Sequence, residues 1–294
     1  MPEPTIVIDH LTKRFGRTTA VNDVSLTVQA GEVFGFLGPN GAGKTTTIRC
    51  MMDFYRPTAG SIRLMGLDAN TEGVLSRKHV GFMPPVTALN EKWTSCEHFD
   101  YARALRKAHD RSAELVQRLE IDTTKTIKQL SSGNRQKVSL AMAFMFTTDV
   151  VILDEPTNGL DPLLQQTAYE LIHEAHQRGA TIFMSSHNLA EVERTCTRVG
   201  ILRNGNLIAQ ETMLSLQEKH LYTVQLWFNH DVAPASIMLP NATVIVAQPR
   251  TVTLKYQGVM QPLLDSIARL KPYDVSINHA TLEEHFMTFY NHQV

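Results

Sequence analysis

The stretch that decides the fold is Gly38-Pro39-Asn40-Gly41-Ala42-Gly43-Lys44-Thr45, which matches the pattern G-x-x-x-x-G-K-[S/T]. The apolar run Glu32–Leu37 before it predicts a buried strand, and Thr45–Tyr55 after it predicts a helix. Glycines let such a loop curl until its N–H groups face phosphate oxygens, and the helix N-terminus adds partial positive charge. We therefore expect a phosphate-binding loop, with Lys44 on the β- and γ-phosphates and the Thr45 hydroxyl on Mg²⁺.

Around this loop, strand patterns alternate with helical ones. Thr5–Val28 alternates polar and apolar residues, with turn signals at Phe15-Gly16-Arg17 and Asn22-Asp23, and predicts a small antiparallel sheet. Further strands are expected at 61–65, 149–154, 181–185, 199–202 and 206–209, and helices at 94–120, 165–177 and 189–195. This alternation favours an α/β fold with a mostly parallel sheet.

The pattern changes after about Ser215. Strands are expected at 222–228, 243–247, 252–256 and 275–278, and helices at 260–270 and 282–290. We therefore predict two domains, residues 1–214 with a helical subdomain at about 90–148, and a small α+β domain at 215–294.

Composition narrows the function classes. The chain has 294 residues, of which 43% are hydrophobic, and a net charge of −1, which gives no electrostatic case for nucleic-acid binding. Its three cysteines show neither disulfide nor zinc-ligand spacing. The first residues lack the pattern of a signal peptide, and no run of 18 apolar residues occurs. A membrane role is therefore expected to depend on a partner.

A second group of residues suits the phosphate site. The apolar run Val150–Leu153 ends in Asp154 and Glu155. A nucleotide site with Mg²⁺ needs an acidic residue at the end of a neighbouring strand, and Asp154 would hold the ion through water. Glu155 would polarise the attacking water.

Several short motifs follow the order found in the ATP-binding subunit of ABC transporters, which residues 4–212 resemble. Leu130-Ser131-Ser132-Gly133-Asn134 is similar to the L-S-G-G-Q signature. Asn158-Gly159-Leu160-Asp161 resembles the loop after the acidic strand, and Ser185-Ser186-His187 resembles the switch histidine. Phe15 matches the aromatic residue that stacks on adenine. The resemblance implies a P-loop NTPase core with an N-terminal antiparallel β-subdomain and a helical subdomain.

The resemblance also assigns site residues and an activity, ATP hydrolysis. Glu155, His187 and Lys44 would be catalytic, and Thr45 and Asp154 would bind the metal. The expected nucleotide-binding residues are Phe15, Gly38, Pro39, Asn40, Gly41, Ala42, Gly43, Lys44, Thr45, Thr46, Ser131, Gly133 and Asp161. Ser131 and Gly133 would face ATP held by a second ATP-binding subunit, which makes a homodimer or a heterodimer.

The sequence departs from the family pattern at two places. Pro85 stands where the family has Gln or Glu, and proline offers neither an N–H nor a side-chain oxygen. In the signature, Ser132 replaces Gly and Asn134 replaces Gln. The sequence therefore predicts a competent ATPase with slow turnover.

The last residues indicate the kind of transporter. Ala280–Phe286 resembles the closing L-E-E-x-F helix of type-2 ABC exporter ATPases. The resemblance implies a polytopic permease partner and a place on the cytoplasmic side of the cell membrane. Two alternatives stay open, a soluble ABC ATPase that acts on ribosomes or DNA and a non-hydrolysing regulatory half of a heterodimer.

Overall fold

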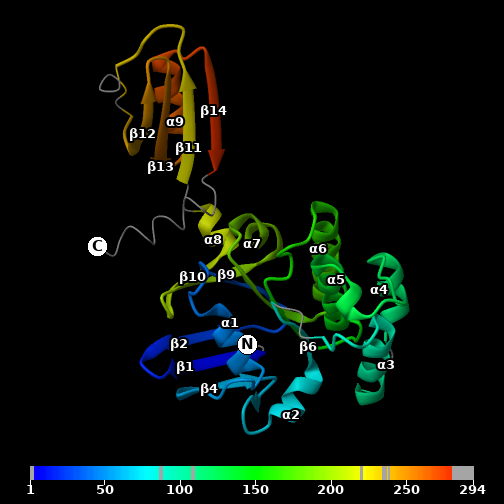
Figure 1. The fold of residues 1–294 in the computed structure, drawn as a ribbon. Coiled ribbons are helices and arrows are strands. Elements are labelled where there is room, and N and C mark those ends of the chain that lie inside the picture. Colours follow the sequence, from blue (N-terminus) through cyan, green and yellow to red (C-terminus); the bar gives the residue numbers. More distant parts are fainter. Residues whose placement is uncertain are drawn as a thin grey trace. The chain divides into compact units, whose positions relative to one another are not determined.

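The computed structural model describes residues 3–85, 89–106, 110–218, 221–233, 237 and 239–279. The chain divides into two compact units, Met1–Gln210 and Glu211–Val294 (Figure 1). The boundary expected from the sequence, between residues 214 and 215, falls a few residues later. Among the described residues, no helix is long and apolar enough to cross a bilayer. The expected helix at 282–290 and the Ala280–Phe286 motif lie outside the described residues.

A six-stranded sheet forms the centre of the first unit, in the order β10-β9-β3-β8-β7-β6. The pairs β3–β8, β3–β9, β7–β8 and β6–β7 are parallel. Every residue of β3, β7 and β8 is buried, because helices and the second sheet cover both faces. The strands are β3 (Val33–Leu37), β6 (Val80–Met83), β7 (Val150–Asp154), β8 (Thr181–Ser186), β9 (Arg198–Arg203) and β10 (Asn206–Thr212).

A four-stranded antiparallel sheet, in the order β2-β1-β4-β5, confirms the predicted N-terminal β-region. The sequence suggested a turn at Asn22-Asp23, but the structure has none there. The pair lies within β2, where the pairing with β1 shifts register and Asp23 has φ 53°. A polar pair with left-handed backbone suits a bulge as well as a turn. The strands are β1 (Ile6–Phe15), β2 (Thr18–Val28), β4 (Ala59–Leu64) and β5 (Leu67–Asp68).

One core lies between these two sheets. It joins Ile6 and Ile8 of the antiparallel sheet to Phe34 and Phe183 of the central sheet, with Ile48 of α1 among them. Helix α1 (Lys44–Met51) ends earlier than the predicted Tyr55, since Asp53 has left-handed backbone, φ 58°. The helix after the phosphate loop is thus fixed against both sheets.

The remaining helices of the first unit follow the predicted pattern with different bounds. The predicted helix at 94–120 is two helices, and the one predicted to start at Gln165 starts at Pro162, because Asp161 caps it there. The helices are α2 (Gly73–Ser76), α3 (Ser95–Arg106), α4 (Ser112–Arg118), α5 (Ser132–Phe144), α6 (Pro162–Gln177) and α7 (Leu189–Thr195), with 3₁₀ turns at Arg77–His79 and Ile127–Gln129.

The second unit is a four-stranded antiparallel sheet, in the order β12-β13-β11-β14. Helix α9 packs on one face, where Leu263 and Ile267 meet Val224, Leu226 and Leu254. Its elements are α8 (Met213–Glu218), β11 (Leu221–Trp227), β12 (Ala242–Gln248), β13 (Thr251–Gln257), α9 (Met260–Leu270) and β14 (Asp274–His279).

Candidate functional site

The phosphate loop borders an open cavity of about 310 Å³. Predicted residues from the loop line it, together with Glu155 from the end of β7. Three further residues line it: Ala20, which no motif included, Pro85, at the position where the family has Gln or Glu, and Asn158, from the loop after the acidic strand. The full lining is Ala20, Asn40, Gly41, Ala42, Gly43, Lys44, Thr45, Thr46, Pro85, Glu155 and Asn158.

At two positions of the loop the neighbouring backbone lies so close that only glycine fits. A Cβ on Gly38 would lie 2.4 Å from the carbonyl oxygen of Leu202, in the next strand of the sheet. Gly43 has φ 109°, and a Cβ there would lie 2.5 Å from the carbonyl oxygen of Ala20. Only glycine fits a left-handed backbone at that distance. The loop is therefore held tightly against β2 and the end of β9.

Sheet topology brings the predicted catalytic residues to this loop. Lys44 follows β3, Glu155 follows β7 and His187 follows β8, all at carboxyl ends of parallel strands. Such ends share one edge of the sheet, where ligands of α/β folds bind. The sequence suggested that the acidic strand, β7, is the direct neighbour of β3. The structure differs, because β8 lies between β3 and β7.

The three side chains form a chain of contacts. Lys44 Nζ lies 3.1 Å from Glu155 Oε1 and donates to the carbonyl oxygen of Gly38 at 2.6 Å. His187 Nδ1 lies 2.6 Å from Glu155 Oε2. Lys44 and Glu155 are only 5% and 11% exposed, whereas His187 is 47% exposed. A carboxylate held between two basic groups, at the edge of the phosphate cavity, is placed to accept a proton from water.

Glu155 has an unusual backbone for its residue type. Its φ is 54°, and its N–H donates to Ser185, to the hydroxyl at 3.1 Å and to the carbonyl oxygen at 3.3 Å. A non-glycine residue in this region costs energy and persists only where the surroundings fix it. Glu155 also lines the cavity, and strained backbone of this kind clusters at functional positions.

Asp154 is fully buried beside the loop. Its Oδ1 accepts from the Ser185 hydroxyl at 2.5 Å, while Oδ2 has no hydrogen-bond partner among the described residues. Burial raises the pKa of this carboxyl, and the hydroxyls of Ser185 and Thr45 partly offset the effect. An oxygen without a partner, next to the Thr45 hydroxyl, suits a hard cation.

Other predicted residues lie away from the cavity lining. Ser131 caps α5 by accepting from the N–H of Asn134 at 3.3 Å, and Gly133 packs near the carbonyl oxygen of Gly159. Asp161 caps α6, where its Oδ1 accepts from the N–H groups of Leu163 and Leu164. These helix ends lie beside the 158–161 loop and contribute nothing to the lining of this chain's own phosphate cavity.

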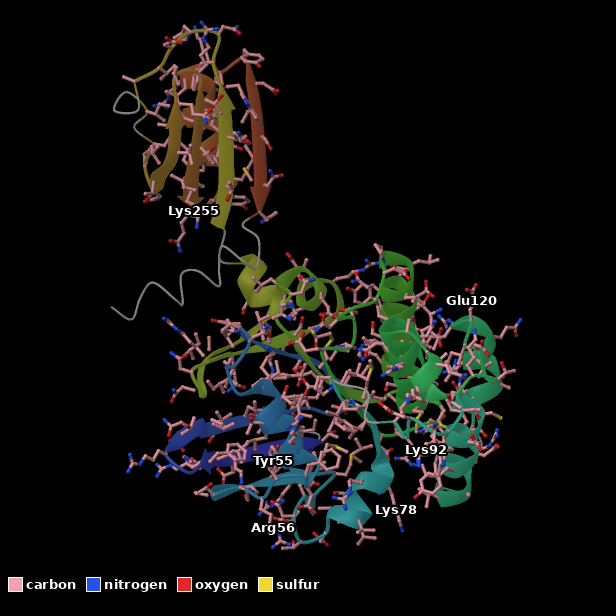
Figure 2. All side chains as sticks on the ribbon, in the orientation of Figure 1. Tyr55, Arg56, Lys78, Lys92, Glu120 and Lys255 are labelled. Carbon is pink, nitrogen blue, oxygen red and sulfur yellow. The ribbon has the colours of Figure 1, made fainter. Side chains whose placement is uncertain are left out.

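Phe15, at the end of β1, presents an exposed ring. It meets Tyr55 edge to face at 5.2 Å between ring centroids, and Lys13 Nζ lies 5.0 Å from its centre. Tyr55, which lies over the N-terminal sheet in Figure 2, thus supports the ring from one side. An exposed, supported aromatic face can stack on a nucleobase.

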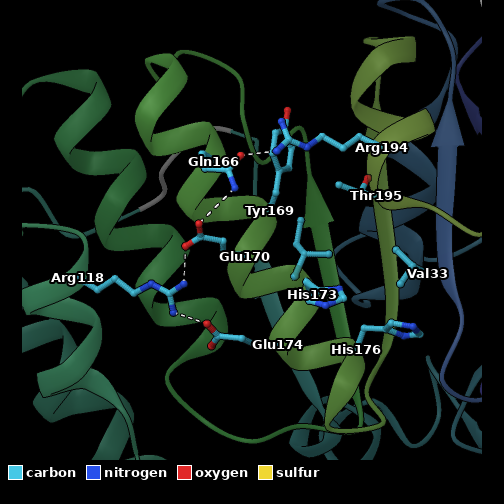
Figure 3. Close-up of a pocket in the computed structure, with 11 residues that line it drawn as sticks. Val33, Arg118, Gln166, Tyr169, Glu170, His173, Glu174, His176, Arg194 and Thr195 are labelled. Atoms are coloured by element: carbon cyan, nitrogen blue, oxygen red, sulfur yellow. Dashed lines mark hydrogen bonds and ion pairs between the residues drawn. The ribbon is translucent and has the colours of Figure 1, made fainter.

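A larger cavity, of about 410 Å³, lies beside α6 (Figure 3). It contains none of the predicted site residues, and its main charged groups are engaged with one another. Arg118 pairs with Glu170 and Glu174, and Arg194 donates to Gln166. Size alone does not make it the functional site, because Val33, its one residue from the strand β3, stands at the amino end of that strand, whereas ligands of α/β folds bind at carboxyl ends.

Comparison with known proteins decides the family. A family model described as ABC transporter matches residues 21–158. Nod factor export ATP-binding protein I of Burkholderia lata is 35% identical over 228 residues, which cover 75% of this chain and 75% of that protein. The chain belongs to the ABC transporter family.

Two further relatives extend this result. Daunorubicin resistance ATP-binding protein DrrA3 of Streptomyces coeruleorubidus is 30% identical over 305 residues, which cover 98% of this chain and 96% of that protein. A solved ATP-binding subunit of an ABC transporter, 30% identical, superposes with a TM-score of 0.67 over 73% of this chain and 92% of its own. This ABC protein binds and hydrolyses ATP, as the resemblance implied.

Proposed function

We propose that this ABC protein is the ATP-hydrolysing subunit of a membrane exporter, with Lys44, Glu155 and His187 as its catalytic residues. The observation that carries the proposal is the contact chain Lys44–Glu155–His187 at the phosphate loop. Lys44 would bind the terminal phosphates, the Glu155 carboxylate would accept a proton from the attacking water, and His187 would contact the γ-phosphate. The names of the relatives, which refer to export and drug resistance, favour an exporter.

Mg²⁺ is the cofactor that fits the residues present. Thr45 would hold the ion through its hydroxyl, and Asp154 through its unpartnered Oδ2 or through water. Bound there, the ion supplies positive charge that offsets charge on the phosphoryl oxygens. Ser185 keeps the carboxylate in place by donating to Oδ1.

The remaining ATP contacts would come from a second ATP-binding subunit. Ser131 and Gly133 stand at the N-terminus of α5 but do not line their own chain's cavity. A helix of 13 residues directs free N–H groups and partial positive charge toward an anion at that end. In a sandwich of two subunits this end would meet the γ-phosphate held by the other, and Asp161 would lie in the interface.

A polytopic permease is the proposed membrane partner. Large exposed apolar side chains lie on the segments that precede and follow Pro85 in the chain. They are Phe54, whose ring packs against Phe82 of β6, and Tyr101 and Leu105 on α3. Basic residues accompany them, and Figure 2 shows Arg56, Lys78 and Lys92 along one edge of the first unit. Exposed apolar side chains close together mark protein interfaces. The chain would then lie at the cytoplasmic face of the membrane, held there by the permease.

Purification from detergent-solubilised membranes tests the partner. The full chain is expected to co-purify with a polytopic membrane protein. Leu105→Asp is expected to reduce the amount of recovered partner at least roughly tenfold, because burying the new carboxylate unpaired in the interface costs more than about 1.4 kcal/mol. Val259→Asp, at an equally exposed apolar residue of the second unit, serves as the matched control. Recovery with ribosomes instead would contradict the proposal.

Replacing Pro85 by Gln is expected to raise the rate of ATP turnover. Pro85 lines the phosphate cavity but can neither donate nor accept through its side chain. A Gln amide oxygen there would add one polar contact to the metal or the water, about 1 kcal/mol, or roughly fivefold in kcat. Phosphate release under saturating ATP measures the effect.

Pro84→Gln is the control for this change, since Pro84 does not line the cavity. The same substitution one residue away should leave kcat unchanged. An equal rise in both variants would show that loop stiffness, and not the lost side-chain contact, limits turnover.

A further inference from the structure

Glu191 is a buried acidic residue on α7 that has no part in the motifs described above. Glu191 is only 2% exposed, and its carboxylate forms no ion pair with any described residue. Both carboxyl oxygens accept hydrogen bonds from hydroxyl groups instead. Thr157 donates to Oε1 at 2.8 Å, and Ser186 donates to Oε2 at 2.5 Å.

These two hydroxyls belong to the segments that carry the catalytic pair. Thr157 is two residues after Glu155, and Ser186 directly precedes His187. The carboxyl group of Glu191 therefore joins the end of β7 to the end of β8 beyond the last ladder pair, Asp154 with Ser185. It links the two segments beyond the hydrogen bonds that the Glu155 N–H donates to Ser185.

Further hydrogen bonds fix this bridge on both sides. The Ser186 hydroxyl also accepts from the N–H of Asn188 at 2.9 Å, and Asn188 caps α7 through the N–H groups of Ala190 and Glu191. On the other side, the Tyr169 hydroxyl lies near Thr157. Figure 3 shows Arg194 reaching the Tyr169 ring. Its guanidinium carbon lies 4.8 Å from the centre of that ring.

The arrangement is costly, which argues for a role beyond packing. Burial raises the pKa of the Glu191 carboxyl, and the nearby Glu155 charge acts in the same direction. A buried acidic group without a cationic partner is destabilising compared with an apolar residue of similar volume. Glu155 in turn needs rigid surroundings to keep its φ of 54°.

We propose that Glu191 is a positioning residue, whose bridge from Thr157 to Ser186 holds the Glu155 carboxylate and the His187 ring in contact during ATP hydrolysis. The inference rests on the proposed roles of Glu155 and His187. The bridge acts on the 2.6 Å contact between Nδ1 and Oε2 and does not touch ATP. Displacement of a catalytic group by about 1 Å can lower a rate by roughly 100-fold.

Kinetics of the full-length chain test the bridge. Glu191→Ala is expected to lower kcat by roughly 10- to 100-fold, as loss of an orienting partner does, and to leave the Kd for ATP within about threefold. Glu191→Gln should retain most of kcat, because its amide still accepts from Thr157 and can donate to Ser186. Glu193→Ala, an exposed glutamate on the same helix, should behave as the wild type.

A double variant separates positioning from a general structural role. In a His187→Ala background, Glu191→Ala should lower kcat by no more than about twofold, because the pair on which it acts is already broken. Additive losses would overturn the proposal, as would parallel losses of kcat and ATP binding. Thr157→Val, which removes one hydroxyl at constant size, should lower kcat in the same way if Glu191→Ala does not fold.

The outcomes distinguish this inference from the proposed function. Wild-type kcat in both Glu191→Ala and Thr157→Val, with a large loss in Glu155→Gln, would overturn the bridge alone. Equal rates in the wild type and Glu155→Gln would overturn the catalytic role of Glu155, and with it the function on which the bridge depends.

Discussion

Replacing Glu155 by Gln is expected to lower ATP turnover at least about 100-fold while ATP binding stays intact, since removing a general base costs roughly 10²–10⁴ in rate. The amide has nearly the same shape but cannot accept a proton from water. In the wild type, Glu155 Oε1 lies 3.1 Å from Lys44 Nζ, and its negative charge competes with the ATP phosphates for this lysine. The variant removes that charge, so the affinity for ATP should be unchanged or higher.

Single-turnover hydrolysis and equilibrium ATP binding measure the two halves of this prediction. Glu193→Gln, at an exposed glutamate of α7, is the matched control and should change neither quantity. An unchanged turnover in Glu155→Gln would show that another group activates the water. A parallel loss of ATP binding would show that the carboxylate mainly orders the loop.

Replacing Asp154 by Asn is expected to reduce Mg²⁺-dependent turnover by roughly 100-fold, because a metal contact in a catalytic site is worth several kcal/mol. The same change should stabilise the metal-free protein at neutral pH. Asp154 is buried with Oδ2 unpartnered, and burial raises the pKa of its carboxyl. Asn keeps an oxygen for the Ser185 hydroxyl without the buried charge.

The sign of the pH dependence follows from linkage. Because the folded-state pKa of Asp154 lies above its ordinary value, folding favours the protonated form. The wild type loses stability as the pH rises through the interval between the two values, and the Asn variant does not. Thermal unfolding in chelator should show the stability gain at pH 7, and the gain should disappear below the ordinary pKa of aspartate.

Asp265→Asn, at an exposed aspartate of α9, controls for a change of net charge. A lower melting temperature for Asp154→Asn at pH 7 would mean that the carboxylate is stabilised by its neighbours despite burial. Full Mg²⁺-dependent activity in that variant would remove Asp154 from the proposed metal site.

Local sequence signals predicted local structure well. The turn at Asn204-Gly205, where φ is 48° and 80°, joins β9 to β10 between the strands expected at 199–202 and 206–209, and Asn-Gly is a common turn signal. The same kind of signal failed at Asn22-Asp23, which lies in a bulge of β2. A polar pair with left-handed backbone fits either structure, and only pairing with β1 over its whole length decides between them.

The sequence by itself determined the Gly38–Thr45 loop, because the whole pattern that identifies it lies within eight consecutive residues. The spacing of its glycines permits the curl, and Lys44 stands at the start of the helix that follows. Only the tertiary structure decided how the loop meets Glu155 and His187, because β8 lies between β3 and β7. It also decided that Glu191 is buried against Thr157 and Ser186, since burial of an acidic helix residue depends on which elements pack around it.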